Sequence, residues 1–248
     1  MKQRIKIPLR HFFATPPTPC PYLAERSERK VVTLLAGDDP DRLHQALSEA
    51  GFRRSQDLAY RPACEACDAC VAVRIPAHRF RPNRSMRRVA ARNREIKVRE
   101  LGPTAQLEHF ELFHRYLVSR HADGGMADMS FADYRAMVED SPVRTTLVEF
   151  REPDGRLLAV CLTDRMRDGL SLVYSFFEPR AARRSPGIYI ILWHVARAKE
   201  IGTEYVYLGY WIADSPKMSY KARFRPLEAL TPSGWTPFLP NGASPQPA

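Results

Sequence analysis

The sequence lacks several features that would place the protein in or beyond a membrane. None of its apolar runs approaches the ~18 residues that a membrane-spanning helix needs. The first residues, MKQRIKIPLRHFF, are basic, but their apolar stretch is short and broken by Pro8, so no signal peptide is predicted. The 248 residues include only 5 cysteines, an odd number that favours free thiols or metal ligands over disulfides. These absences predict a cytoplasmic protein with no membrane partner.

Acidic residues are almost absent from one long stretch of the chain. The net charge is +10, and between Arg74 and Arg99 nine arginines and one lysine stand against a single acid, Glu95. Such a density of positive charge favours a polyanionic partner, above all a nucleic acid. Within this stretch NRSMRRVAARNREI predicts a helix whose arginines recur every four residues on one face. We assign contacts with the nucleic-acid backbone to Arg84, Arg88 and Arg92.

Three of the five cysteines lie within YRPACEACDACVAVRIP, where Cys64, Cys67 and Cys70 are each separated by two residues. Cys20, in TPCPYL, would complete a set of four thiolate ligands. This spacing suits a [4Fe–4S] cluster, and zinc is an alternative. Thiols that bind no metal, and that pack in the interior or respond to redox conditions, are the third reading. Cys161, in LLAVCL, is expected to be a core residue.

The spacing of apolar residues predicts a mixed α/β protein. DRLHQALSEAG is typical of a helix with Asp39 as its cap and Gly51 as its end. From about residue 96 the predicted order is a strand, two helices, three strands, a helix, a strand, a short helix and a strand. The segments are EIKVREL; TAQLEHFELFHRYLVSRH, with Leu107, Phe110, Phe113 and Leu117 inward, and the helix that SFAD caps; TTLVEF, LLAVCL and LSLVYSF; SPGIYIILWHVARAKEIG; EYVYLGYW; KMSYKARF; and a strand near LEALTP.

This order of elements is typical of the GNAT acyltransferase fold, an α/β (α+β) fold. The three strands before the long helix should form an antiparallel meander, because only the turns EPDG and RDG separate them. We expect a smaller N-terminal domain at residues 1–95, with the cysteines and the basic segment. A GNAT-like domain follows at 96–238, and residues 239–248 are expected to form a disordered tail.

The stretch RSPGIY stands where GNAT acetyltransferases carry [QR]-x-x-G-x-[GA], the turn that binds the pyrophosphate of CoA. Arg184 and Gly187 fit this pattern, but Tyr189 replaces the small last residue and would crowd a pyrophosphate. We therefore expect a donor other than CoA at a similar place. The alternative is an ordinary helix start that Ser185 caps.

Aromatic and basic residues are concentrated in VYLGYWIADSPKMSYKARFRP. Strand alternation predicts that Tyr207 and Tyr210 lie on opposite faces. The stretch could form an aromatic and cationic wall at a binding site, or only an aromatic-lined core strand. A second stretch, SRHADGGM, brings Arg120 and His121 to a helix end, where surface charge alone is the alternative.

Several of these stretches, taken in order, resemble the aminoacyl-tRNA–protein transferases of the N-end rule. The resemblance is to the bacterial leucyltransferase branch, relatives of the eukaryotic arginyltransferases, and it covers Cys20 to Trp235. The family usually has Leu where Pro186 stands, and its eukaryotic members have a second cysteine where Leu23 stands. The motifs that carry it are CPYL, GFRRSQDLAYRPACEACDACVAVRIP, FRPNRSMRR, RHADGGM, GLSLVYSFFEP and YVYLGYWIADSPKMSYKARFRP.

The resemblance implies an enzyme that transfers leucine from leucyl-tRNA to the α-amino group of proteins that begin with Asp or Glu, which marks them for degradation. Arginine is the alternative acyl group, and the related eukaryotic enzymes make a cysteine-bound cluster or metal plausible here. A tRNA donor fits the basic segment, and it needs no CoA. The reaction is aminolysis of an activated ester, which requires no cofactor, only positioning and mild base help.

Site residues follow from this chemistry. We assign catalysis, by proton relay or by a cation that faces the acidic acceptor, to Tyr207, Tyr220 and Lys221. We assign the acceptor and the 3′ end of the tRNA to Arg120, His121, Arg184, Ser185, Gly187, Tyr210, Lys217 and Arg223. The competing hypotheses are an N-acetyltransferase of the GNAT fold and a metal- or redox-sensing regulator that binds nucleic acid.

Overall fold

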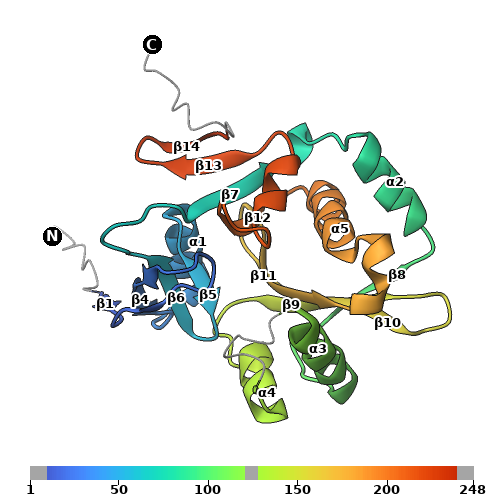
Figure 1. Ribbon diagram of the computed structural model, residues 1–248, viewed down its shortest axis with the longest axis horizontal. Helices are drawn as coiled ribbons and strands as arrows, with labels where there is room; N and C mark the ends of the chain where they lie inside the picture. Colours follow the sequence, from blue (N-terminus) through green and yellow to red (C-terminus); the bar gives the residue numbers. More distant parts are fainter. Residues whose placement is uncertain (1–9, 121–127, 239–248) are drawn as a thin grey trace, which may run out of the picture.

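The computed structural model describes residues 10–120 and 128–238. His121 and the tail from residue 239, expected to be disordered, lie outside the described residues. Within these two ranges, no helix combines the length and the apolar character that crossing a bilayer requires. The described chain forms one small and one large sheet, with helices packed around the large one (Figure 1).

The small sheet comes from the first third of the chain and has the strand order β1-β4-β6-β5. Helix α1 packs beside it and starts as predicted, with the Asp39 carboxylate accepting a hydrogen bond from the Arg42 amide and Pro40 as first residue. Gly51 follows the helix with a φ of 84°, a conformation that glycine adopts freely. The elements are β1 (Phe13–Ala14), β4 (Lys30–Leu34), α1 (Pro40–Glu49), β5 (Arg53–Ser55) and β6 (Leu58–Pro62), with a separate pair β2 (Thr18–Pro19) and β3 (Ser27–Glu28).

The large sheet has the strand order β14-β13-β7-β12-β11-β10-β9-β8. The meander of β9, β10 and β11 is antiparallel, as the short turns predicted, and β8 pairs antiparallel with β9 at its edge. The order from β8 to β12 confirms the GNAT-like α/β fold expected from the sequence. The elements are β7 (Val71–Pro76), η1 (Ala77–Arg79), α2 (Arg84–Arg92), β8 (Lys97–Leu101), α3 (Leu107–Arg120), α4 (Phe131–Glu139), β9 (Thr145–Arg151), β10 (Leu157–Arg165), β11 (Gly169–Phe177), η2 (Pro179–Arg184), α5 (Pro186–Glu200), β12 (Tyr205–Trp211), η3 (Ser219–Arg223), β13 (Glu228–Thr231) and β14 (Gly234–Pro237).

The large sheet crosses the domain boundary that we placed at residue 95. Strand β7 precedes that boundary, yet it pairs with β12 on one side and β13 on the other. Five of its six residues are buried, as expected for a strand covered on both faces. Helix α2 also precedes residue 95 and packs against α5. The N-terminal segment therefore contributes a central strand to the large sheet.

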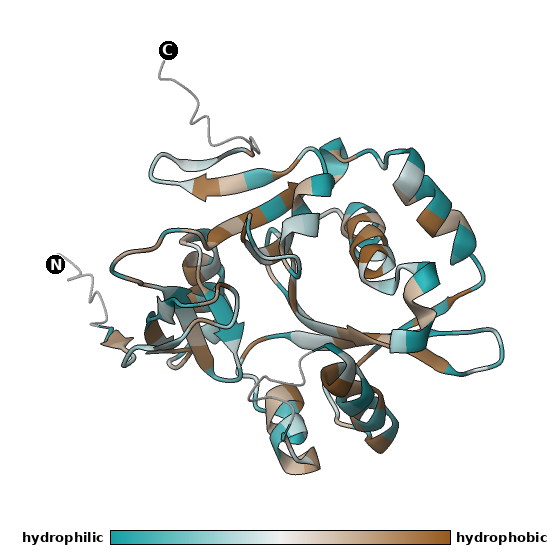
Figure 2. Cartoon of the chain, in the orientation of Figure 1, coloured by the Kyte–Doolittle hydropathy of each residue, from teal (hydrophilic) through white to brown (hydrophobic). Residues whose placement is uncertain are grey.

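Helices cover both faces of the large sheet. Helix α5 packs on one face, where Ile191 and Val195 contact the apolar residues of β7 and β12. Helices α3 and α4 pack on the other, around Phe113 and Tyr134 (Figure 1). In Figure 2 hydrophobic colours dominate α5, whereas hydrophilic colours dominate α2. Helix α2 therefore presents a polar face to solvent.

One predicted core residue is wrong. Leu107 is 61% exposed, whereas Leu112, Phe113 and Leu117 are fully buried. Leu107 is the first residue of α3, whereas Leu112, Phe113 and Leu117 pack in the cluster that contains residues of β10 and β11. In the first turn of α3, His109 is buried in place of Leu107.

A buried ion pair joins the small sheet to the large one. The guanidinium of Arg54, on β5, donates to both carboxylate oxygens of Asp164, on β10, at 2.7 and 2.8 Å. Thr145 donates to the same carboxylate at 2.9 Å. Because both charged side chains are fully buried, loss of either partner would leave an uncompensated charge. This contact fixes β5 against the centre of the large sheet.

Candidate functional site

The site is built around a gap between two parallel strands. Strands β11 and β12 pair only over Gly169–Ser171 and Tyr205–Tyr207. Beyond that point β11 continues its pairing with β10, and β12 continues its pairing with β7. Each strand therefore leaves one edge without a strand partner, and we call this region the β11–β12 gap. Side chains from distant parts of the chain meet there.

A β-bulge at Leu208 changes which side chains of β12 share a face. Tyr207 pairs with Arg74 of β7, and Gly209 pairs with the adjacent residue, Val73. Leu208 is therefore an extra residue without a partner on β7. Tyr207 and Tyr210 consequently point to the same face, and the alternation that we predicted for them is wrong. Both reach toward α1: the Tyr210 hydroxyl donates to the Gly51 carbonyl at 2.9 Å. Tyr207 packs on Trp235, whose indole donates to the carbonyl of a residue in α1.

The hydroxyl of Tyr207 is fully engaged inside the protein. It donates to Asp168 at 2.7 Å and accepts from Arg74 at 3.0 Å. Arg74 also pairs with Glu228 at 2.9 Å and lies over the ring of Tyr205. Burial, with the adjacent Asp168 carboxylate, raises the pKa of Tyr207. This network gives Tyr207 a structural role, and a proton relay through it stays an untested prediction.

Lys221 and Tyr220 lie on η3, which packs against β12. The Lys221 ammonium donates to the carbonyl of Tyr210 at 2.6 Å. Burial, and then the nearby charge of Arg53, lower the pKa of Lys221 from 10.5 to about 7. The Tyr220 hydroxyl has no hydrogen-bond partner within the described ranges, and burial raises its pKa to about 12. The lowered pKa suits Lys221 to act as a mild base near neutral pH.

Arg53, on β5, bridges the gap and was not among the predicted site residues. Its guanidinium donates to the Ser171 hydroxyl at 3.0 Å and to the carbonyl of Leu172, both on β11. It also lies beside Gly209 of β12. The motif GFRRSQD pointed to this segment, but strand pairing alone could not show which of its two arginines reaches the gap.

Two of the predicted binding residues, Gly187 at the start of α5 and Arg120 at the end of α3, lie against Phe177 at one end of β11. The Arg120 guanidinium lies 5.3 Å from the centre of the Phe177 ring, and a Cβ on Gly187 would lie 3.4 Å from the same ring. Ser185 begins α5 in a left-handed conformation and makes no side-chain cap, so the capping that we considered for it is wrong. Arg184 pairs with Glu152 at 3.3 Å.

Tyr189 turns into the interior. Its ring packs 5.8 Å from that of Phe150, centre to centre, within an apolar cluster. It therefore gives no argument of its own against CoA, contrary to the prediction from its size. Pro186, where the family usually has Leu, is the first residue of α5, a position that suits proline.

A surface rich in arginine runs over α2, η2 and η3, and we call it the basic face. The Arg92 side chain donates to the carbonyl of Arg183, and the Asn93 amide donates to that of Arg184 at 2.9 Å, which ties α2 to η2. Arg223 of η3 donates to Ser85 of α2 at 3.4 Å. In the described part of the chain, none of the exposed arginines of the face forms an ion pair. They are Arg84, Arg87, Arg88, Arg92, Arg94, Arg180, Arg183 and Arg223.

Lys217, also exposed, lies in the loop between β12 and η3. Most of the predicted residues thus fall into four groups, of which Arg120, Arg184, Ser185 and Gly187, near the start of α5, are the first. Tyr220 and Lys221 lie beside β12 near the gap, and Arg84, Arg88, Arg92 and Arg223 lie on the basic face. Tyr210 instead lines a cavity together with cysteine side chains. The structure does not bring all of them to one point.

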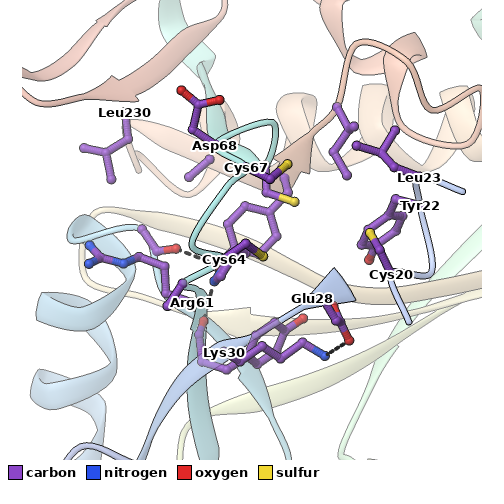
Figure 3. A pocket seen from close by; sticks show the side chains of 18 of the residues that line it. Cys20, Tyr22, Leu23, Glu28, Lys30, Arg61, Cys64, Cys67, Asp68 and Leu230 are labelled. Carbon is purple, nitrogen blue, oxygen red and sulfur yellow. Dashed lines mark hydrogen bonds and ion pairs between the residues drawn. The ribbon is translucent and has the colours of Figure 1, made fainter. Parts of the chain in front are cut away.

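All four predicted metal ligands line a single cavity of about 620 Å³ (Figure 3). Burial, and then the neighbouring thiols of Cys20, Cys64 and Cys67, raise the pKa of Cys70 to about 11. Four thiols are a fitting donor set for iron or zinc. However, within residues 10–120 and 128–238 no three His, Cys, Asp or Glu side chains are arranged to hold a metal ion as they stand. A ligand set would require these side chains to move closer together.

Comparison with known proteins decides the family. The model of the arginine-tRNA-protein transferase N terminus matches residues 18–88, and that of the C terminus matches residues 108–231. This chain belongs to the arginine-tRNA-protein transferase family. Among its relatives, the aspartate/glutamate leucyltransferase of Paramagnetospirillum magneticum is 56% identical over 92% of this chain and 94% of the relative. The aspartate/glutamate leucyltransferase of Parvibaculum lavamentivorans is 54% identical over 90% of this chain and 93% of the relative.

One matching solved structure is far more distant in sequence. The L-PGS structure from Bacillus licheniformis is 15% identical, with a TM-score of 0.43 over 58% of this chain and 47% of that chain. A likeness of this size carries no argument about function. The family assignment confirms the resemblance inferred from the motifs, and it identifies the protein as an aminoacyl-tRNA–protein transferase enzyme.

Proposed function

We propose that this transferase moves leucine from leucyl-tRNA to the α-amino group of proteins that begin with Asp or Glu, and so creates a degradation signal. The observation that carries the proposal is the identity of 56% and 54%, over nine tenths of the chain, with relatives named aspartate/glutamate leucyltransferase. The charge of the site agrees with it, since the gap presents cations to an acidic acceptor. The protein would act in the cytoplasm, where charged tRNA is available.

The tRNA would bind across the basic face. The exposed arginines of α2 lie beside η2 and η3, so a phosphate backbone on them would pass close to Lys221 and to the start of α5. Each phosphate contact adds affinity that salt weakens. The 3′ end, with its leucyl ester, would then reach the β11–β12 gap.

The chemistry is attack of the acceptor amine on the leucyl ester carbonyl. The amine loses a proton as the new amide forms, and the 3′ oxygen of the tRNA gains one as it leaves. The Lys221 amine is suited to accept the first proton, because burial keeps its pKa near neutrality. The hydroxyl of Tyr220 is suited to pass a proton to the leaving oxygen. Positioning of the two reactants would supply most of the rate.

The four cavity cysteines would be the ligands of a [4Fe–4S] cluster or of zinc, if the protein carries either. Such a group would cross-link the loop before β3 to the loop before β7 and so stabilise the lining of this cavity. No step of the transfer depends on it, because ester aminolysis is neither a redox nor a metal-dependent reaction.

The deciding experiment supplies labelled leucyl-tRNA, arginyl-tRNA or acetyl-CoA to peptides that differ only at the first residue. We expect leucine on peptides that begin with Asp or Glu, and none on those that begin with Asn, Gln or Ala. Transfer of the acetyl group instead would identify an N-acetyltransferase. Arginine as the preferred group would correct the donor and leave the acceptor rule in place.

A further inference from the structure

Arg53 has an unusual position for a charged residue. Its guanidinium is half-buried between two strands of the large sheet, yet no carboxylate in the described part of the chain pairs with it. Its partners, the Ser171 hydroxyl and the Leu172 carbonyl, are both uncharged. Partly buried cations are normally paired with an anion, because removal from water costs free energy that neutral acceptors offset only in part. The missing anion is therefore expected to be a ligand.

The neighbouring residue shows what a structural arginine looks like at this place. Arg54 is fully buried and binds Asp164 through two hydrogen bonds. Both residues extend from the same short strand toward the large sheet. The chain thus supplies a carboxylate for Arg54 and leaves Arg53 without one.

Arg53 also keeps one edge open. Two of its five N–H groups are used, by Ser171 and Leu172, whereas the N–H of Nε and the second N–H of Nη2 have no acceptor within the described residues. A Cβ at position 209 would lie 3.0 Å from Nε and 3.5 Å from Nη2. The same Cβ would lie 3.3 Å from Cζ, so Gly209 packs over the flat face of the guanidinium, and its lack of a side chain allows this close approach. The N–H of Nε and the second N–H of Nη2 have the geometry for two parallel hydrogen bonds to one carboxylate.

We propose that Arg53 is the residue that binds the side-chain carboxylate of the acceptor's first residue and so sets the enzyme's preference for Asp and Glu. This inference rests on the proposed leucyl transfer. The guanidinium is held in place by β11, and its face packs against Gly209, which leaves the N–H groups of Nε and Nη2 for a ligand. Tyr210 directly follows Gly209, and its backbone carbonyl accepts a hydrogen bond from the Lys221 amine. The acceptor's carboxylate and α-amine are separated by only a few bonds, so this spacing places the amine near the base.

Lys221 is the less suitable cation. Burial lowers its pKa to about 7, so its positive charge is no longer assured at neutral pH. Its ammonium is also bonded to a backbone carbonyl. Arginine stays charged at every physiological pH and grips a carboxylate with two N–H groups, which an ammonium does not do. Arg53 therefore binds the carboxylate of the acceptor, and Lys221 accepts the proton.

The test compares Arg53→Gln, Arg53→Lys and the exposed control Arg42→Gln on α1. The measurement is kcat/KM for leucyl transfer to two peptides that differ only by Glu or Gln at the first position. We expect the wild type and Arg42→Gln to prefer Glu by about 10² to 10⁴-fold. Arg53→Gln should reduce this preference to within about tenfold of unity. Arg53→Lys should reduce the preference for Glu by about tenfold or more, because lysine keeps the positive charge but lacks the two parallel N–H groups of the guanidinium.

The preference ratio separates recognition from general damage, since a misfolded fraction lowers both activities equally and leaves the ratio unchanged. An unchanged ratio in Arg53→Gln would overturn the proposal while leucyl transfer stands. If that variant does not fold, an unchanged ratio in Arg53→Lys would overturn it equally. Should the wild type itself show no transfer to either peptide, the proposed function fails instead, and the two failures are thus distinguishable.

Discussion

Replacing Lys221 by Met should stabilise the protein and remove most of its activity. The buried amine is costly: its pKa falls from 10.5 to about 7, and each tenfold change in proton affinity is worth about 1.4 kcal/mol. Holding it in the folded chain therefore costs about 4 kcal/mol at pH 7. Met fills a similar volume without charge, but it leaves the Tyr210 carbonyl without this donor, which costs about 1–3 kcal/mol. The net gain is expected to be about 2 kcal/mol, or about 4–8 °C in Tm.

The gain should depend on pH in a defined direction. Between pH 7 and 10.5 the unfolded chain holds a proton on Lys221 that the folded chain has lost, so the stability of the wild type rises with pH across that window. The Met variant lacks this titration. Its advantage over the wild type should therefore shrink by about 3 kcal/mol between pH 7 and pH 10.

Urea unfolding at pH 7 and pH 10 measures this difference directly. In parallel, kcat/KM for a Glu-starting peptide should fall by about 10² to 10⁴-fold, as for loss of a catalytic base, with tRNA affinity unchanged. A stability difference that stays constant over this pH range would refute the lowered pKa. Full activity in the Met variant would refute the assignment of Lys221 as base.

Three further predictions concern other parts of the molecule. Changing Arg84, Arg88 and Arg92 to Gln should weaken tRNA binding and reduce the slope of log K against log salt by about 2–3, while the protein still folds. An unchanged slope would remove this helix from the tRNA surface. Protein purified without oxygen should contain iron or zinc that Cys67→Ser loses, and wild-type protein free of both would end the metal assignment. His194 is buried, with its pKa lowered to about 4 by burial, so the unfolded chain binds its proton first as pH falls below 6.5. Unfolding at pH 5 should therefore be easier than at pH 7 by about 2 kcal/mol in the wild type and by less in His194→Gln.

The sequence was sufficient wherever structure depends on neighbours along the chain. Asp39 caps α1, and the Ser130 and Asp133 pair forms the capping box of α4 as predicted, because both motifs depend only on residues a few positions apart. The meander of β9, β10 and β11 follows from its short turns in the same way.

Contacts between distant segments were not accessible to the same reasoning. Nothing in VAVRIP states that β7 pairs with β12 and β13, since an apolar strand can join any sheet that covers both its faces. The bulge at Leu208 is a single-residue change of register, and periodicity alone cannot detect it. That one residue moves Tyr210 to the face of Tyr207. It also sets Gly209 beside Arg53, which is why the arginine was missed.

The proximity of Arg53 and Lys221 has a consequence for how selection operates. The positive charge of Arg53 contributes to the lowered pKa of Lys221, so a carboxylate bound to Arg53 would offset that effect and raise the proton affinity of the amine. An acidic acceptor thus strengthens the base that activates it, whereas a neutral acceptor of the same shape does not. Selection should then appear in kcat as well as in KM, because the carboxylate both anchors the substrate and tunes the proton acceptor. A recognition residue that acted only by holding the substrate would change KM alone.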